Sequence, residues 1–418
     1  MDTLRYLACI VSRRAVATVA CYALGAMASY SGTSVAQTPG ANSVKIGLVY
    51  AKQGPSAAIG QFLEEGTQIA VQQAGSKVLG RPVELIWLDE PNPQVGQQNM
   101  QKLIDENRVV AVMGGTISST ALAMAAVAQR RQIPFIATNG AAAELTGKAC
   151  NRYTFRTQPT ALVHTRALLP YLAKTGKNWY SITPSYAFGQ DTLKEARTLA
   201  PRFGASLIGS DEVAVNTADY SAYLLKIRQA KPDAVITALV GADLSNFLKQ
   251  WSELGMKDKL PIAGVAVSDS DFWSIGPAAT TGFYAKPWYY ADPRNTPADK
   301  TFIAAFESRY HRPPSEKAWL GWFSTRALLQ SIEAARSTDP KAIVSALEKW
   351  HVDEGGIDVR FRDGDHQLVR PLLILRAKPK IADKYDFFDV VEHTPASPAD
   401  LASAYGTPGE LGCRMPAL

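Results

Sequence analysis

Short apolar runs that end at glycine turns and lead into helical segments recur along most of this chain, and this alternation restricts the possible folds more than any other feature. Three early runs have the length and β-branched content of buried strands: 44–50, 83–88 and 109–113. Helical periodicity follows each of them. Because strands that alternate with helices pair in parallel, the pattern predicts an α/β sheet with helices on both faces.

A second series of the same kind begins near Thr160. Its strands are expected at 178–183, 205–212, 234–240 and 262–267, with helices at 191–203 and 219–230. Helices at 298–310 and 319–335 are expected to return to the first series. Trp319 and Trp322 on the second of these helices are expected in the core, and the rim of the cleft is the alternative. Two βα lobes with several crossings imply a cleft that closes by a hinge motion. Segments 358–361 and 368–375 are expected to form a hairpin around Asp363-Gly364, and past Phe388 the sequence gives little regular signal.

The first 36 residues differ from the rest of the chain. Arginines precede an uncharged run at 15–30, which ends in small residues and Ser34-Val35-Ala36. This order is typical of a cleaved secretory signal, and the run is shorter than the roughly 20 apolar residues that a membrane anchor needs. Segment 1–36 is therefore predicted to be a signal peptide of an exported protein.

Charge and cysteine content narrow the possible partners. The net charge of +6 over 418 residues falls to about +4 when the three arginines and one aspartate of 1–36 are removed, and no nucleic-acid partner is predicted. Cys150 and Cys413 then remain, and in an oxidising compartment they most simply pair and tie the tail to the first lobe. Two free thiols are the alternative. The five histidines are scattered, so neither a metal nor another cofactor is predicted.

The stretch 109–128 carries the main candidate site. Its strand leads through Gly114-Gly115 and a hydroxyl cluster that includes Ser118 and Ser119 directly into an Ala-rich helix. Unpaired backbone N–H groups at such a corner suit a carboxylate or another small anion, and ligands of parallel sheets bind at the carboxyl edge. The alternative is that Ser118 or Ser119 only caps the helix.

Motifs of the common enzyme classes are missing from the sequence. No Gly-x-Ser-x-Gly elbow surrounds the serine cluster, and no Gly-x-Gly-x-x-Gly follows the first strand. Segment 140–148 departs from a phosphate loop in its spacing, and Ala149 stands where Ser or Thr is needed. Without a nucleophile–base pair or a metal cluster, the chain is not predicted to be an enzyme.

From Val44 to about Val391 the chain resembles type I periplasmic binding proteins of the branched-chain amino acid receptor kind, the ligand-capturing subunits of bacterial ABC importers. The matching blocks are Gly54-Pro55 with Gly60, 114–120, Glu144-Leu145-Thr146, Phe188-Gly189 and the helix 243–255. The resemblance implies two Rossmann-like α/β lobes joined by three hinge crossings, with the ligand in the cleft between them. It also implies a periplasmic monomer that meets the membrane only through an ABC permease.

The resemblance also implies domain boundaries and ligand contacts. Lobe 1 is expected at 42–158 with 288–352, lobe 2 at 159–287 with 353–391, and a tethered tail at 392–418. Ser118 matches the serine that binds the ligand carboxylate, and Asn139, Gly140 and Ala141 match the contacts of the next loop. Val265 falls where amino acid binders carry the acid that pairs with the ligand ammonium. Because burying an unpaired ammonium costs about a few kcal/mol, a free α-amino acid is disfavoured.

The chain is most similar to the branch of this family that binds aromatic carboxylates, through Trp179-Tyr180, 186–189, Tyr284 and the cysteine pair. An aromatic acid needs an anion-binding corner, stacking rings and a distal hydrogen-bond partner. The candidates, in that order, are Ser118, Ser119 and Asn139; Tyr186, Phe188 and Tyr284; and Asp243. The alternatives are core packing for the rings and a helix cap for Asp243.

The leading hypothesis is therefore a receptor that delivers a small organic acid, expected to be aromatic, to an ABC permease. A receptor for an amino acid or amide, with its amine paired by Asp243, is the alternative within the same transporter family. A sensor that presents its ligand state to a membrane receptor and an exported enzyme on the same fold are the other hypotheses.

Overall fold

The computed structural model describes residues 42–395 and 398–415, so the expected signal peptide lies outside the described residues. Within those ranges the strands form a six-stranded, a seven-stranded and a three-stranded sheet. None of the helices in the described part combines the length and apolar content needed to cross a membrane.

The six-stranded sheet has the order β2-β3-β1-β4-β5-β6. Its strands are β1 (Val44–Val49), β2 (Lys77–Val78), β3 (Arg81–Leu88), β4 (Ala111–Gly114), β5 (Phe135–Ala137) and β6 (Thr154–Arg156). β3, β1, β4, β5 and β6 run parallel, and β2 is antiparallel to β3. The parallel pairing expected from the βα repetition is confirmed.

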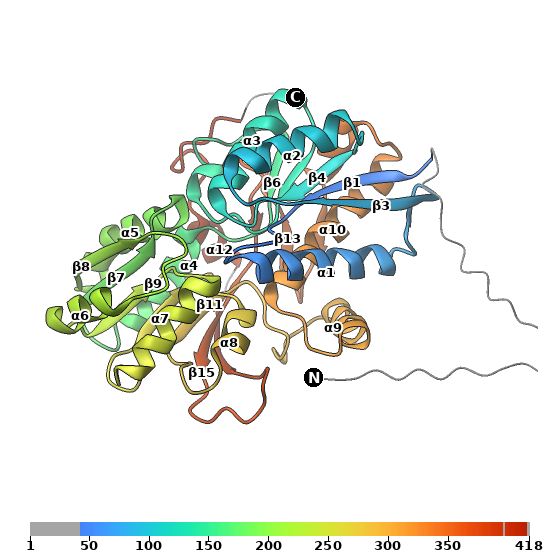
Figure 1. The fold of residues 1–418 in the computed structure, drawn as a ribbon. Coiled ribbons are helices and arrows are strands. Elements are labelled where there is room, and N and C mark those ends of the chain that lie inside the picture. The colour runs from blue at the N-terminus through green and yellow to red at the C-terminus, as the bar shows by residue number, and fades with distance from the viewer. Residues whose placement is uncertain (1–41, 396–397, 416–418) are drawn as a thin grey trace, which may run out of the picture. The chain divides into compact units, whose positions relative to one another are not determined.

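Helices cover both faces of this sheet, α2 and α3 on one face and α1 with α10 on the other (Figure 1). The helices that pack with the six-stranded sheet are α1 (Ala57–Gln73), α2 (Pro93–Asp105), α3 (Ser118–Arg131), α9 (Pro297–Tyr310), α10 (Glu316–Ala335) and α11 (Pro340–Leu347). α1 and α10 approach closely because glycines face the contact: a Cβ on Gly66 would lie 1.8 Å from the Ala318 carbonyl oxygen. Trp319 and Trp322 are buried in the same core, as expected.

The seven-stranded sheet has the order β16-β15-β11-β10-β9-β7-β8. Its strands are β7 (Asn178–Pro184), β8 (Ser206–Val213), β9 (Ala234–Thr237), β10 (Ile262–Val265), β11 (Phe283–Lys286), β15 (Leu372–Ala377) and β16 (Phe388–Thr394). β7 to β11 run parallel, and β15 and β16 are antiparallel additions.

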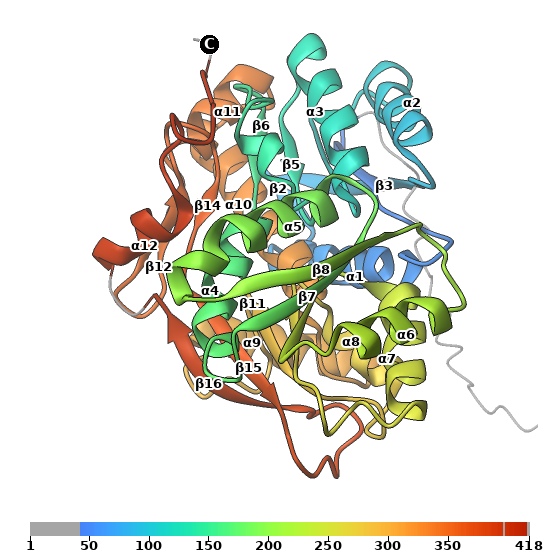
Figure 2. The same ribbon diagram turned by 90° about the vertical axis from the view of Figure 1, so that its left-hand side faces the viewer.

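Each face of the second sheet has its own core, because alternate residues of a strand point to opposite sides. Ala234 and Ile236 pack in the core that contains residues of α4 (Ala161–Leu172) and α5 (Ala187–Leu199). Val235 packs in the core with α6 (Ser221–Ala230), α7 (Gly241–Glu253) and α8 (Asp269–Ile275). Figure 2 shows α5 on one side of β7 and β8, and α6 and α7 on the other. Short 3-10 turns follow β5 at Ala143–Thr146 and α5 at Ala200–Phe203.

The chain passes between the two sheets three times, after β6, after β11 and after β14. The small third sheet consists of β12 (His351–Asp353), β13 (Asp358–Phe361) and β14 (Leu368–Val369). β13 and β14 form the hairpin expected around Asp363-Gly364, whereas β15 pairs with β11 and β16 instead. The division into lobes stays a proposal, and Val359, Phe361 and Leu368, which pack in the first core, favour placing 353–370 with lobe 1.

The C-terminal segment is more regular than expected. β16 and α12 (Pro398–Tyr405) follow Phe387, and Tyr405 is buried in the second half of the molecule. The Cys150–Cys413 disulfide then joins the segment to the loop before β6 in the first half. The expectation of an irregular tail is wrong because β16 gains order from pairing with β15, a long-range contact that its own sequence does not indicate.

Candidate functional site

We call the part of the molecule built on the six-stranded sheet the first half and the part built on the seven-stranded sheet the second half. Two adjoining cavities lie between residues of these halves, beyond the carboxyl ends of β1, β4 and β5. The inner cavity, of about 20 Å³, is lined by Ser56, Ile59, Thr116, Ile117, Ser118, Asn139, Ala141, Gln158, Tyr186, Phe188, Val240, Ala266 and Lys317. The outer cavity, of about 180 Å³, is lined by Ala51, Gln53, Gly54, Pro55, Ser56, Glu90, Pro91, Ile117, Pro184, Tyr186, Val215, Asn216, Val240 and Asp243. Four residues, Ser56, Ile117, Tyr186 and Val240, belong to both walls.

Six of the ten sequence-predicted ligand residues lie at these cavities. Ser118, Asn139, Ala141, Tyr186 and Phe188 line the inner cavity, and Tyr186 and Asp243 line the outer one. Ser119, Gly140, Val265 and Tyr284 line neither.

Ser118 is the first residue of α3 and does not cap it, because Ile117 holds the cap position and makes no side-chain cap bond. The Ser118 Oγ instead accepts hydrogen bonds from the backbone N–H groups of Ala141 (3.0 Å) and Ala142 (3.1 Å). This hydroxyl therefore fixes the loop after β5 against α3. Because both bonds use its lone pairs, its own O–H proton is available to donate into the cavity.

The anion-binding corner predicted at Gly114–Thr120 is partly filled by the protein itself. The Glu90 carboxylate accepts hydrogen bonds from the Gly115 N–H (3.0 Å) and the Ile117 N–H (3.1 Å). Glu90 is buried, and burial raises the pKa of its carboxyl to about 8. These two N–H groups are thus not free for a ligand, and the expectation must be corrected for them.

Two amides leave buried oxygens without a hydrogen-bond partner in the described protein. Asn139 donates from Nδ2 to the Thr116 carbonyl (2.6 Å), but its Oδ1 has none. Gln158, which is 1% exposed, likewise leaves Oε1 unpaired. Burying an unpaired polar group costs about 1–3 kcal/mol, so both oxygens, which are acceptors, favour a hydrogen-bond donor such as a water or a hydroxyl group in the inner cavity.

Lys317, in the first turn of α10, contributes a cation to the inner cavity and is 2% exposed. Its Nζ lies 3.1 Å from Glu316 Oε1 and 3.5 Å from the Ala266 carbonyl oxygen. Glu316 also faces the second half, where its Oε2 accepts from the Asp269 N–H (3.0 Å) and lies 3.8 Å from Lys286 Nζ. Burial raises the pKa of Glu316, but Lys286, Lys317 and the hydrogen bonds with Asp269 together outweigh this effect, and the net pKa is lowered.

Asp243 lies in the first turn of α7 and faces the outer cavity. It is not the cap, which is Val240. Its Oδ2 accepts from the Asn216 N–H (3.2 Å), and its buried Oδ1 has no partner within the described protein. Burial raises the pKa of this carboxyl. Asp243 therefore offers a hydrogen-bond acceptor to a ligand.

The aromatic residues divide between the site and the core. The rings of Tyr186 and Phe188 lie with centroids 6.3 Å apart at the cavity wall. Tyr284, by contrast, packs against Phe272 (4.6 Å) and Phe388 (5.5 Å) on the α8 side of the second sheet. The assignment of Tyr284 as a stacking residue is corrected, because its position in β11 turns its side chain into the core.

The remaining predicted residues support the cavity from behind. Val265 is fully buried in the core on the α4 side, and the next residue, Ala266, lines the inner cavity with a φ of 55°. At Gly140, a Cβ would lie 2.7 Å from the Ala121 Cβ, so the absence of a side chain lets the loop lie close to α3.

Sequence reasoning missed Lys317, Gln158 and Glu90. Lys317 had a usable signal, because it and Glu316 are charged residues directly before a run of apolar helix residues. Gln158 lies in the crossing after β6, and that three-residue strand is too short to show periodicity. Among the described residues, no group of three or more His, Cys, Asp or Glu is arranged to hold a metal ion.

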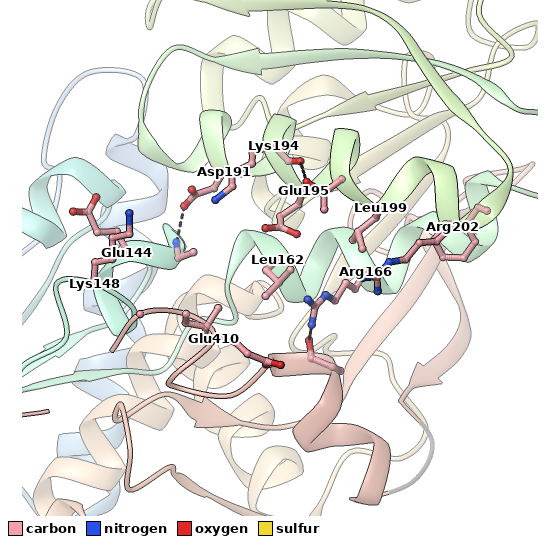
Figure 3. Close-up of a pocket in the computed structure, with 17 residues that line it drawn as sticks. Glu144, Lys148, Leu162, Arg166, Asp191, Lys194, Glu195, Leu199, Arg202 and Glu410 are labelled. Carbon is pink, nitrogen blue, oxygen red and sulfur yellow. Dashed lines mark hydrogen bonds between the residues drawn. The ribbon is translucent and has the colours of Figure 1, made fainter. Parts of the chain in front are cut away.

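A larger hollow, of about 830 Å³, lies elsewhere, between α4, α5, the turn at Ala143–Thr146 and the C-terminal segment (Figure 3). Its labelled side chains carry charges of both signs, including Glu144, Lys148, Lys194 and Glu195. Asp191 accepts from the Ala143 N–H (2.6 Å), and Arg166 donates to the Ala404 carbonyl (3.0 Å). These bonds tie the two halves and the tail together, and the hollow shows no single chemical preference.

The chain is 25% identical over 364 residues to Leu/Ile/Val-binding protein homolog 8 of Brucella suis biovar 1, covering 81% of this chain and 89% of that protein. An amino acid ABC transporter substrate-binding protein from Pseudomonas fluorescens Pf-5 has the same fold, with a TM-score of 0.79, 24% identity and coverage of 90% of this chain and 99% of that one.

A solute-binding protein of an ABC transporter from Rhodopseudomonas palustris BisB5, solved with 3,4-dihydroxybenzoic acid, gives a TM-score of 0.76 at 22% identity. It covers 83% of this chain and 96% of that one. Residues 43–384 also match the periplasmic binding protein family as a whole. The two-sheet α/β fold and this match agree with the resemblance seen in the sequence, and the chain belongs to the periplasmic binding protein family.

Proposed function

We propose that this protein captures a small organic acid, of the aromatic carboxylate class, between its two lobes and delivers it to an ABC permease. The observation that carries the proposal is the composition of the inner cavity. Two residues of its wall, Ser118 with its hydroxyl and Lys317 with its ammonium, can donate to a carboxylate, and Tyr186 and Phe188 contribute rings to the same wall. Polar groups for a carboxylate next to aromatic surface fit a benzoate-like molecule.

A known structure of similar fold supports this ligand class. The Rhodopseudomonas palustris relative was solved with 3,4-dihydroxybenzoic acid, a ring with a carboxylate at one end and hydroxyl groups at the other. In this chain the unpaired Oδ1 of Asp243 at the outer cavity supports a similar distal donor. The proposal includes export by the segment 1–36, a periplasmic monomer and a membrane permease as partner.

One observation favours a second candidate, an amino acid or amide. The outer cavity is lined by two acids, Glu90 from the first half and Asp243 from the second. An ammonium group there would find Asp243 as a partner, in place of the acid that is absent at Val265. This candidate keeps the same transporter role with a different ligand.

Calorimetry and thermal unfolding of the purified protein test these candidates together. The ligands are benzoate, 4-hydroxybenzoate, 3,4-dihydroxybenzoate, cyclohexanecarboxylate, leucine and phenylalanine. A ligand present at 100 times its Kd stabilises the native state by about 2.7 kcal/mol, which a thermal shift detects. We expect the aromatic acids to bind and leucine not to bind. Binding by leucine or phenylalanine alone would reject the aromatic acid in favour of the second candidate.

A further inference from the structure

Among the described residues that line the inner cavity, Lys317 alone carries a charge, whereas the outer cavity carries the acids Glu90 and Asp243. The raised pKa of about 8 keeps the Glu90 carboxyl largely protonated at neutral pH, so the contrast in charge between the adjoining cavities rests on Lys317 and Asp243. A ligand that spans both would place its anionic group at the inner end. This polarity was not apparent in the sequence, where these residues lie far apart.

The ammonium of Lys317 is incompletely paired. It has three N–H donors, and its protein contacts are Glu316 Oε1 at 3.1 Å and the Ala266 carbonyl at 3.5 Å, the outer limit for a hydrogen bond. Glu316 is itself shared, because its Oε2 accepts from the Asp269 N–H and lies near Lys286. The Glu316 N–H donates in turn to Asp269 Oδ2 (3.2 Å). Asp269 and Lys286 thus hold Glu316 in place, and its carboxylate leaves part of the Lys317 ammonium without a partner.

Other charges near Lys317 have their own partners. Asp269 is ion-paired with Lys286, and Asp271 accepts from the Gly241 N–H (3.1 Å) and the Ser268 N–H (3.2 Å). His164 is fully buried, and burial lowers its pKa to about 4, so it is neutral at neutral pH. Lys317 is therefore the charged residue of the inner cavity wall that still has N–H donors available for a ligand.

We propose that Lys317 is the specificity-determining residue that pairs with the carboxylate of the bound ligand, and that Glu316 positions it at the cavity wall. This inference rests on the proposed capture of an organic acid in this cleft. The carboxylate completes the coordination of the ammonium, and the Ser118 hydroxyl lines the same cavity as a second donor. Charge-assisted bonds of this kind are short and stronger than neutral ones. Lys317 then selects acids over their uncharged amides.

Calorimetry with benzoate and benzamide on the full-length protein tests this role. We expect Lys317→Met to weaken benzoate binding by about 10- to 100-fold and to leave benzamide binding unchanged. Lys317→Arg keeps the charge and should retain more benzoate affinity than Lys317→Met. Lys102→Met, on the exposed surface of α2, is the matched control and should bind both like the wild type.

Removing only one member of a buried ion pair can destabilise the fold, so a second variant is needed. The double change Glu316→Gln with Lys317→Met removes the pair as a unit, and the introduced amide oxygen can still accept from the Asp269 N–H. It should fold, as judged by urea unfolding, and lose benzoate affinity to the same extent. Benzoate binding within threefold of the wild type in the folded variants would overturn the role of Lys317 and leave the proposed function intact. If the wild type binds no carboxylate of the panel, both proposals are rejected.

Discussion

Replacing Ser118 by Ala tests the hydroxyl that joins α3 to the loop after β5. The substitution removes the acceptor of two backbone N–H groups, those of Ala141 and Ala142, which are 3% and 0% exposed. Each buried donor left without a partner costs about 1–3 kcal/mol. Since local relaxation lets one of them find another acceptor, we expect the free energy of unfolding to fall by about 2–4 kcal/mol. Ligand affinity should fall as well, by about 1–3 kcal/mol, because the hydroxyl donor is lost.

Urea unfolding measures the first effect and calorimetry with 4-hydroxybenzoate the second. Ser119→Ala is the matched control, because Ser119 occupies the next position of the same helix and lines neither cavity. It should change stability by less than about 0.5 kcal/mol. If Ser118→Ala is as stable as the control, the two hydrogen bonds from Ala141 and Ala142 do not stabilise the loop after β5. Unchanged affinity would show that Ser118 shapes the loop without contacting the ligand.

Three further predictions concern other groups. Asp243→Asn should weaken 4-hydroxybenzoate binding at least about fivefold, because the buried Oδ1 then no longer offers a charged acceptor to the ring hydroxyl. Benzoate has no such hydroxyl, so its binding should stay unchanged, and equal losses for both acids would contradict the role of Asp243. Glu90, whose folded pKa of about 8 exceeds its unfolded value, stabilises the fold at low pH and loses this effect as pH rises through about 8. The unfolding free energy of the wild type minus that of Glu90→Gln should therefore decrease from pH 5 to pH 9 by at most about 1.4 kcal/mol per pH unit, and a pH-independent difference would refute it. Thiol titration of the exported, denatured protein should find no free thiol at Cys150 or Cys413, and two free thiols would exclude the tether.

The sequence predicted the fold well where local signals are strong. The runs at 44–50 and 178–183 became β1 and β7 nearly unchanged, because both are rich in the apolar and aromatic residues that a buried parallel strand favours. Elements that depend on distant partners were missed. β6 has three residues, and β16 is a strand only because β15 pairs with it. The lobe to which segment 353–370 belongs is hard to predict for the same reason, since the core residues it packs against lie far away in the chain.

The candidate site was predicted for the loops of the first half, the start of α5 and the first turn of α7. Ser118, Asn139 and Tyr186 follow strands or begin helices, positions that a parallel sheet brings to one edge. Gln158 reaches the same cavity from the crossing after β6 and Lys317 from the first turn of α10, and their placement depends on how the two halves meet. The prediction of Tyr284 failed because a single residue type does not tell which face of a strand it occupies.

The cavity volumes constrain how a ligand is bound. The inner cavity, of about 20 Å³, is large enough for about one water, whereas the outer one measures about 180 Å³. A ligand that reaches both Lys317 and Asp243 must pass the four shared wall residues, of which Ser56 and Ile117 belong to the first half and Tyr186 and Val240 to the second. The halves already touch there, because the Ala242 N–H lies 3.4 Å from the Pro55 carbonyl oxygen and a Cβ on Gly241 would lie 2.4 Å from that oxygen. Binding therefore requires Tyr186 and Val240 to move away from Ser56 and Ile117. The affinity for the ligand then depends on the difference between the contacts it makes and the contacts between the halves that it replaces.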